Sequence, residues 1–335
     1  MANISILGAG GWGIAIAILL DNNGNHVTIW SAVDREVKML SEQRENEISL
    51  KGIRISKDIQ ITADLEEAIK DKDIIVMAVA SAYTRATAAR LKGRLKDGQI
   101  IINLAKGIED NTLMTLSEVI EQELPNTDVA VLSGPSHAEE VGRGLPTTCV
   151  AGAKTKETAA YIQNIFMSKC FRVYISPDIL GIELGGALKN VIALAAGIAD
   201  GLGYGDNTKA ALITRGISEI GRLGTAMGAN TQTMFGLTGI GDLIVTCASM
   251  HSRNRRAGIL IGQGYTMDAA MKEVNMVVEG VQSAKAALHL AEKYNVSMPI
   301  IEKVNEVLFH DLSAKDAVND LMMRDKTLEH PDLLW

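Results

Sequence analysis

The first half of the chain alternates short β-branched runs with amphipathic stretches. The runs that predict strands are 4–7, 27–30, 74–79, 100–104 and 129–132. Strands separated by helical patterns predict a parallel sheet joined by crossover helices. Two more runs, 147–150 and 171–175, flank a predicted helix at 156–166, and we expect them to extend the same sheet.

The pattern changes near residue 181. From there the chain is rich in Ala, Gly, Leu and Met, with apolar positions three and four residues apart, which predicts helices. The apolar positions 188, 191, 192, 195 and 199 fall on one helix face, and 201–207 supplies a break. We expect the two halves to share a cleft near residue 181, and such clefts commonly bind ligands.

A glycine-rich motif, GAGGWG at 8–13, directly follows the first predicted strand and opens a helical pattern at 14–20. In the G-x-G-x-x-G fingerprint, Gly8 allows the tight turn, Gly10 lets a pyrophosphate approach, and Gly13 permits close helix packing. We therefore predict the α/β class, with a dinucleotide-binding Rossmann-type parallel-sheet domain at 1–180 and an all-helical substrate-binding and catalytic domain at 181–335. The predicted cofactor is NAD or NADP.

The end of the second predicted strand bears on the choice between these cofactors. An acidic residue at this point binds the ribose 2′-hydroxyl of NAD, whereas an arginine accommodates the 2′-phosphate of NADP. Here Ala32 stands near the strand tip, Asp34 comes late, and Arg35 follows it. The sequence leaves both cofactors open.

Charge and composition narrow the classes of partner. The 335 residues carry a formal charge of −7, which disfavours nucleic acid. Three cysteines without a close pair, Cys149, Cys170 and Cys247, indicate a reducing compartment and no cysteine-based metal site, and we expect no metal. We see no signal peptide, and the apolar run 191–199 is too short to span a bilayer, so we predict a cytoplasmic protein without integral membrane contact.

Four segments carry polar residues in glycine-rich surroundings: 104–107, 133–138, 185–190 and 239–256. Lys106 and His137 follow predicted strand ends, at the edge where open α/β sheets bind ligands. Each also fits a simpler role, Lys106 as a solvated lysine and His137 as a loop histidine with backbone partners. Lys189 stands in an apolar helical pattern with no acidic partner nearby in sequence, so it is a candidate for chemistry.

The last of these segments leaves two further alternatives open. Asp242 precedes an apolar stretch, so it fits either a helix N-cap or a functional carboxylate. The basic residues Arg253, Arg255 and Arg256 fit either a solvated loop or a phosphate clamp that includes the Asn254 amide.

Taken together, these motifs resemble the bacterial-type NAD(P)-dependent glycerol-3-phosphate dehydrogenases. The resemblance rests on GAGGWG, AKG, GPSHAEE, GGALKNVIALAAGIADGLG, GIGDLIVTC, SRNRR and VVEG, and it covers nearly the whole chain. It implies reversible reduction of dihydroxyacetone phosphate to sn-glycerol 3-phosphate, which supplies glycerophospholipid synthesis. The partner implied is a small phosphorylated substrate.

The resemblance also implies roles for individual residues. Lys189 would be the proton donor in reduction and the acceptor in oxidation, with Lys106 beside it and Asp242 orienting both. The implied substrate-binding residues are Lys106, Gly134, Ser136, Lys189, Asn190, Asp242, Thr246, Ser252, Arg253 and Asn254. The cofactor-binding residues, including those of the glycine motif, are Gly8, Gly10, Gly11, Trp12, Gly13, Lys106, Ala138, Arg253, Val277 and Glu279. Ala32 stands where many relatives carry His or Arg.

Two other functions fit parts of the sequence. A β-hydroxyacid dehydrogenase of related architecture also pairs a dinucleotide fold with a helical domain and a catalytic lysine, although the arginine cluster favours a phosphorylated substrate. A dinucleotide-binding redox sensor would need no Lys106, Lys189 and Asp242 constellation. The many apolar residues of the helical half lead us to expect a homodimer.

Overall fold

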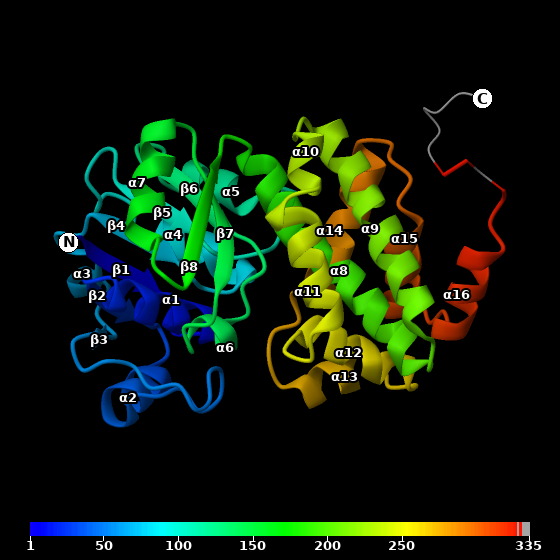
Figure 1. Ribbon diagram of the computed structural model, residues 1–335, viewed down its shortest axis with the longest axis horizontal. Helices are drawn as coiled ribbons and strands as arrows, with labels where there is room; N and C mark the ends of the chain where they lie inside the picture. The colour runs from blue at the N-terminus through cyan, green and yellow to red at the C-terminus, as the bar shows by residue number, and fades with distance from the viewer. Residues whose placement is uncertain (327, 330–335) are drawn as a thin grey trace.

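The computed structural model describes residues 1–326, 328 and 329, so the last part of the predicted 181–335 domain lies outside the described residues. A sheet flanked by helices, at the left of Figure 1, lies beside a group of helices at the right. The predicted boundary at 180/181 falls within the first turns of the helix α8 (Ile179–Gly201), which joins the two parts, and it stays a prediction.

Among the described residues, eight strands form one sheet in the order β3-β2-β1-β4-β5-β6-β7-β8. The strands are β1 (Asn3–Leu7), β2 (His26–Trp30), β3 (Gln60–Thr62), β4 (Ile74–Met77), β5 (Ile100–Asn103), β6 (Asp128–Ser133), β7 (Thr147–Gly152) and β8 (Phe171–Ser176). The first six follow the order of the dinucleotide-binding Rossmann fold. The predicted fold class and the extension of the sheet by two further strands are confirmed, whereas the three-residue β3 was not predicted.

Two strands depart from the predicted parallel sheet. β7 pairs antiparallel to β6, with Ser133 opposite Val150, and β8 runs parallel to β7. The connection between them contains only α6 (Ala138–Val141), and four helical residues rise about 6 Å, whereas a six-residue strand spans about 20 Å. This helix is too short to return the chain to the opposite edge, so residues 134–146 stay at the carboxyl edge of β6.

Helices cover both faces of the sheet, and the strands alternate between two apolar clusters. Ile74 and Val76 of β4 face one cluster, while Ile75 and Met77 face the other, as the two-residue period of a strand requires. The helical segments of this half besides α6 are α1 (Gly11–Asn22), α2 (Asp34–Gln43), α3 (Leu65–Ile69), η1 (Ser81–Tyr83), α4 (Thr84–Ala89), α5 (Leu116–Glu123) and α7 (Lys156–Phe166).

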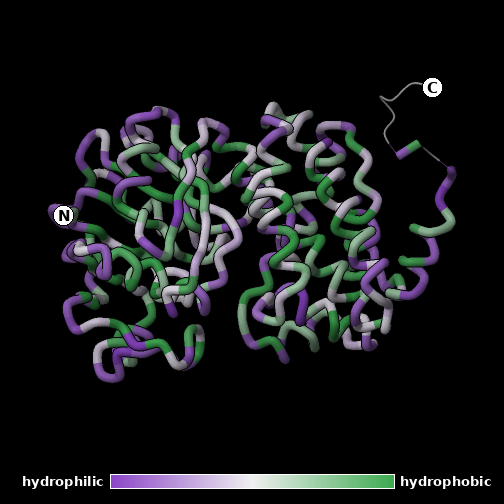
Figure 2. Tube along the Cα trace, viewed as in Figure 1, coloured by the Kyte–Doolittle hydropathy of each residue, from purple (hydrophilic) through white to green (hydrophobic). Residues whose placement is uncertain are grey.

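The second half is helical, as predicted, and it is built around α8. Every residue of α8 from 181 to 199 is buried, and apolar segments gather in the interior of both halves (Figure 2). The other segments are α9 (Asp206–Met227), α10 (Thr231–Met234), η2 (Leu237–Gly241), α11 (Asp242–Ala248), α12 (Arg253–Gly262), α13 (Met267–Val274), α14 (Glu279–Lys293), α15 (Pro299–Phe309) and α16 (Ala314–Met322).

Glycines let α8 and α12 touch backbone to backbone. A Cβ on Gly197 would lie 2.1 Å from the Arg255 carbonyl oxygen, and one on Gly258 would lie 2.2 Å from the Leu194 carbonyl oxygen. Larger residues would push the two helices apart. This contact brings the start of α12 beside the middle of α8.

The core helix α8 is longer than the apolar run 191–199 suggested. By length and composition it could cross a membrane, and the bent pair 231–248 and 253–262 meets the same test when taken together. However, 89% of the most apolar window of α8 is buried inside the protein. This burial is what the central helix of a helical core requires.

Candidate active site

The glycine motif forms the turn between β1 and α1, beside β4. Gly8 has φ +126°, and a Cβ there would lie 2.7 Å from the Ala78 backbone. A Cβ on Gly13 would lie 2.3 Å from the Gly8 carbonyl oxygen, so the third glycine is needed for close packing. No described atom lies within 4 Å of a Cβ built on Gly10, which leaves its backbone open to a ligand.

The surroundings of this turn fit a dinucleotide. The turn leads into the N-terminus of α1, which would hold the pyrophosphate, because a helix N-terminus favours an anion. The buried Trp12 Nε1 has no hydrogen-bond partner among the described residues, so this N–H is available to donate to a ligand. The Ala138 methyl group lies 3.6 Å from a Cβ built on Gly11, which places α6 beside the motif. The residues at 8–13 and Ala138, predicted to bind the cofactor, therefore lie together.

The tip of β2 offers little discrimination between NAD and NADP. Ala32, Asp34 and Arg35 are exposed there. The Ser31 hydroxyl donates to Glu36 Oε2 at 2.6 Å, so this carboxylate already has a partner. The exposed arginine at the start of α2 is compatible with a 2′-phosphate, and the sequence places no carboxylate at the strand end itself.

Three charged side chains from distant segments meet where the two halves join. Asp242, 1% exposed, accepts from Lys189 Nζ through Oδ1 at 2.6 Å and from Lys106 Nζ through Oδ2 at 2.7 Å. Lys189 Nζ also donates to the Thr246 hydroxyl at 2.6 Å. We call Lys106, Lys189 and Asp242 the ionic triad. It unites the loop after β5, the helix α8 and the first residue of α11.

Burial and neighbouring charges oppose one another within the ionic triad. Burial lowers the pKa of Lys189 to about 8, and Lys106 adds to this lowering, while Asp242 opposes it. Burial alone would raise the pKa of Asp242, but the two lysines more than offset it, so its pKa lies below the usual value. At neutral pH the carboxylate is charged, and the Lys189 ammonium needs only a small change in pH to lose its proton.

The predicted substrate residues after β6 lie against Lys106. Its ammonium donates to the Gly134 carbonyl oxygen at 3.0 Å, and the Ser136 hydroxyl donates to the same oxygen at 2.9 Å. A Cβ on Gly186 of α8 would lie 3.5 Å from Lys106 Cγ, so the lysine stem crosses this helix where it carries no side chain. The AKG and GPSHA motifs thus meet as expected.

The start of α12 forms another side of the site. Asn254 Nδ2 donates to Asn190 Oδ1 at 2.9 Å, and Asn254 Oδ1 accepts from the Gly280 N–H at 2.8 Å. Ser252 is the N-cap of α12, where its hydroxyl accepts from the Arg255 N–H. The Arg253 guanidinium makes no hydrogen bond to any described residue, although Glu279 and Glu139 lie near enough to oppose the lowering of its pKa by burial. Arg253 is therefore available to an anion.

The remaining predicted cofactor residues lie at the start of α14. Val277 is 38% exposed, and Glu279 accepts hydrogen bonds from the Ser81 N–H and hydroxyl. Ser81 opens η1, just after β4 at the carboxyl edge of the sheet. This contact links the helical half to the sheet beside the glycine motif.

The structure decides several alternatives that the sequence left open. Asp242 is not an N-cap, since Gly241 holds that position and the Asp242 carboxylate binds two lysines. Lys106 is not a solvated loop lysine, since its ammonium binds Asp242. Arg255 takes no part in a clamp, because it pairs with Asp200 at 2.7 Å. The arginines are not in a solvated loop either, since they open α12.

His137 lies at the N-cap position of α6, near the ionic triad but without a hydrogen bond to it. Its ring centroid is 5.7 Å from that of His251, and its Nε2 is buried without a partner among the described residues. Burial and, to a smaller extent, Lys189 lower the pKa of His137. It is therefore neutral at pH 7, and its predicted alternative role as an acid or base stays a prediction.

Sequence reasoning missed Ser81, Asn103 and Glu183, which hold the site together. The sequence could have indicated Glu183, because a charged residue within an apolar helical pattern needs a partner. It gives no indication for Ser81 and Asn103, because short polar residues are common after strands.

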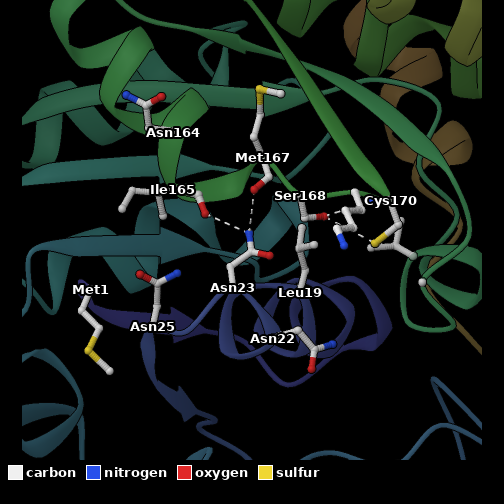
Figure 3. A pocket seen from close by; sticks show the side chains of 13 residues that line it. Met1, Leu19, Asn22, Asn23, Asn25, Asn164, Ile165, Met167, Ser168 and Cys170 are labelled. Atoms are coloured by element: carbon white, nitrogen blue, oxygen red, sulfur yellow. Dashed lines mark hydrogen bonds between the residues drawn. The ribbon is translucent and has the colours of Figure 1, made fainter.

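A cavity of about 560 Å³ lies away from this site. It lies where α1 and α7 end, at the far end of α1 from the glycine motif (Figure 3). Asn23 points its amide toward the end of α7 and donates to the carbonyl oxygens of Ile165 and Phe166 at 3.0 and 3.2 Å. This amide therefore caps a helix rather than facing a ligand.

Comparisons with known proteins decide the family. Family models for the N-terminus and C-terminus of NAD-dependent glycerol-3-phosphate dehydrogenase match residues 3–159 and 178–319. The chain belongs to this family. It is therefore an NAD(P)-dependent oxidoreductase, and the predicted family, enzyme class and cofactors are confirmed.

Individual relatives agree with this membership. A glycerol-3-phosphate dehydrogenase [NAD(P)+] of Agathobacter rectalis is 63% identical over 335 residues, with all of both chains covered. One of Bacillus subtilis is 49% identical, with 100% of this chain and 98% of that protein covered. The crystal structure of glycerol-3-phosphate dehydrogenase from Coxiella burnetii has a TM-score of 0.93 at 34% identity and covers 96% of this chain and 99% of its own.

Proposed function

We propose that this member of the family reduces dihydroxyacetone phosphate reversibly to sn-glycerol 3-phosphate, with Lys189 as the general acid and base. The observation that carries the proposal is the buried ionic triad at the carboxyl edge of the sheet. The start of α12 lies near it, because Asn254 binds Asn190, and Arg253 there makes no hydrogen bond to a described residue. A ketone reductase needs a proton donor at the carbonyl, and a phosphorylated substrate needs a cation at its other end.

Lys189 supplies and recovers the proton. A bound reduced nicotinamide supplies the hydride for the C2 carbonyl carbon of the substrate. Negative charge grows on the carbonyl oxygen, and the Lys189 ammonium stabilises it and donates its proton. Thr246 and Asp242 hold two of the three ammonium hydrogens, which leaves one for the substrate. In oxidation the neutral amine takes the hydroxyl proton back.

Lys106 and Asp242 prepare this lysine. Lys106 lies on the other side of the same carboxylate and helps to lower the pKa of Lys189. Asp242 raises the pKa of Lys189 and so keeps burial and Lys106 from leaving the lysine neutral. The substrate phosphate would bind Arg253, the first turn of α12 and the Asn254 amide, since a guanidinium and a helix N-terminus both favour a phosphate.

The wider biological setting is part of the proposal. All three cysteines, Cys149, Cys170 and Cys247, are free thiols, which supports the reducing environment of the cytoplasm. We propose that the reaction supplies glycerophospholipid synthesis, because sn-glycerol 3-phosphate is the backbone of those lipids. A homodimer, expected from the apolar helical half, completes the proposal.

The assay that tests the function measures oxidation of NADH and of NADPH, each with and without dihydroxyacetone phosphate. We expect loss of reduced cofactor only with the substrate, and the two rates rank the cofactors. Cofactor binding without this oxidation would reject the phosphate ester as substrate and favour a hydroxyacid dehydrogenase or a sensor instead.

Replacing Lys189 tests the acid and base directly. We expect Lys189→Ala to lower kcat for dihydroxyacetone phosphate reduction by at least about a hundredfold, because no other group donates the proton. Binding of NADH, followed by quenching of the protein fluorescence, should be unchanged, since the glycine motif is untouched. A variant that keeps its turnover would contradict the role.

The pH profiles of the two directions should be opposite. With the Lys189 pKa lowered to about 8, the ammonium acid predominates below that pH and the amine base above it. We therefore expect kcat/KM for reduction to fall above about pH 8 and kcat/KM for oxidation to fall below it. Profiles with the same slope in both directions would rule out a single lysine in both roles.

Replacing Arg253 tests phosphate recognition. We expect Arg253→Ala to raise KM for dihydroxyacetone phosphate by about tenfold or more, with a smaller change in kcat, because a charge-assisted hydrogen bond is lost far from the carbonyl. Arg172→Ala is the control, since that guanidinium lies over the Tyr174 ring on β8. If both variants keep the wild-type KM, another basic residue binds the phosphate.

A further inference from the structure

A second buried carboxyl lies on α8, six residues before Lys189. Glu183 is 7% exposed, and its Oε1 accepts from Asn103 Nδ2 and from the Ser117 N–H, each at 3.0 Å. Its Oε2 accepts from the Ser117 hydroxyl. Glu183 thus connects α8 with the end of β5 and with the start of α5. Among the described residues, no hydrogen bond joins Glu183 or Ser117 to the ionic triad.

The link to the ionic triad runs through Asn103. This last residue of β5 holds both polar groups of Ala105: Oδ1 accepts from the Ala105 N–H at 3.0 Å, and Nδ2 donates to the Ala105 carbonyl oxygen at 3.2 Å. Ala105 directly precedes Lys106. Asn103 is held by the sheet, where it pairs with Met77 and Val131, and by Glu183 from the helical half.

A small cavity of about 10 Å³ lies behind Lys106 and joins the same groups. It is lined by Lys106, Asn103, Glu183 and Ser133, whose buried hydroxyl has no partner among the described residues. This volume and this polar lining are the minimum that one ordered water needs. A water there would extend the hydrogen bonds of Glu183 to Ser133.

The apolar surroundings fix the same junction. Val131 of β6, Val150 of β7 and Ile182 of α8 form a separate buried cluster between the sheet and the helical half. Glu183 follows Ile182 directly, so the start of α8 contacts the sheet through an apolar and a polar side chain in succession. The apolar contact holds the two halves together, and the directional hydrogen bonds set their register.

We propose that Glu183 is a positioning residue for the reaction, which through Asn103 holds the Lys106 loop so that Lys106 reaches Asp242 across the junction of the two halves. The inference rests on the proposed function, because it takes Lys189 and its two charged neighbours as the reacting group. Lys106 comes from the sheet half, whereas Asp242 and Lys189 come from the helical half. The triad can form only if the loop after β5 keeps its place.

A misplaced Lys106 would leave a signature in the titration of Lys189. The titratable groups that act on Lys189 are Asp242 and Cys247 of α11 and Lys106, and the imidazole of His137 lies near it as well. Lys106 lowers the pKa of Lys189, so withdrawing that charge raises the pKa. A residue that only stabilised the fold would not move this titration.

The test compares Glu183→Gln and Asn103→Ala with the control Glu219→Gln. In Glu183→Gln the amide N–H groups would face the donors of Ser117 or Asn103, so a hydrogen bond is lost. In Asn103→Ala the two hydrogen bonds to the Ala105 N–H and carbonyl oxygen are lost. Glu219 is also a buried carboxylate, but it accepts from the Ile300 N–H at the start of α15 and contacts no member of the triad. It therefore matches Glu183 in burial and not in position.

In both test variants we expect kcat for dihydroxyacetone phosphate reduction to fall by about tenfold, because an ångström of displacement at a catalytic group is costly. The pH above which kcat/KM for reduction falls should move higher, while the affinity for NADH stays at the wild-type value. Glu219→Gln should keep both kcat and the profile, even if its Tm falls as far as that of Glu183→Gln. An unchanged pH for the falling limb of the reduction profile in the two folded test variants would overturn the proposal, whether kcat stays at the wild-type value or falls.

A measurement without turnover separates this proposal from the proposed function. The Lys189 side chain, labelled with carbon-13 and assigned by comparison with Lys189→Arg, can be titrated by NMR in the free protein. We expect its pKa to be higher in Asn103→Ala than in the wild type, whether or not dihydroxyacetone phosphate is the substrate. If Glu183→Gln and Asn103→Ala fail to fold, Ser117→Ala removes the hydroxyl that donates to Glu183, and an unmoved Lys189 titration there would overturn the proposal.

Discussion

The buried carboxylate of Asp242, held by two lysines, is the interaction on which the rest of the structure depends. Asp242 is 1% exposed, and a buried charge left without its partners costs about 3–5 kcal/mol. Lys189 lies in the same helical half as Asp242, whereas Lys106 comes from the sheet half, so the second ion pair can form only when the sheet and the helices are docked. Docking of the two halves therefore completes the site. The apolar contact of Ile182 with Val131 and Val150 stabilises the docked halves without fixing their orientation.

Backbone contacts at glycines then bring each part of the site to its place. Gly13 lets α1 pack against the β1 turn, which fixes the helix N-terminus that would hold the cofactor's pyrophosphate. Gly197 and Gly258 let α12 lie directly on α8, which brings Asn254 to Asn190, next to Lys189. In each case the missing side chain, rather than an added contact, sets the distance between two functional groups.

Local patterns predicted much of this arrangement. Alternating β-branched runs, the GAGGWG turn and the buried Lys189 all have a local signal, since burial and backbone conformation impose it on neighbouring residues. The antiparallel β7, the pairing of Arg255 with Asp200 and the carboxylate that holds Lys189 depend on residues far apart in sequence. No local pattern encodes such a pairing, which is why Asp242 fitted a helix N-cap as well as a functional carboxylate.

The distribution of charge explains how an acidic protein can bind an anionic substrate. The whole chain carries a formal charge of −7, yet within the described residues Lys106 and Lys189 pair with Asp242, and Glu279 and Glu139 are the carboxylates that act on Arg253. Because the local dielectric is low, these few cations act on a bound phosphate more strongly than distant surface carboxylates, which salt screens. The same burial lowers the pKa of Lys189 to about 8. One physical cause, removal of the lysine from water, therefore both strengthens its interaction with an anion and brings its pKa close to neutral pH.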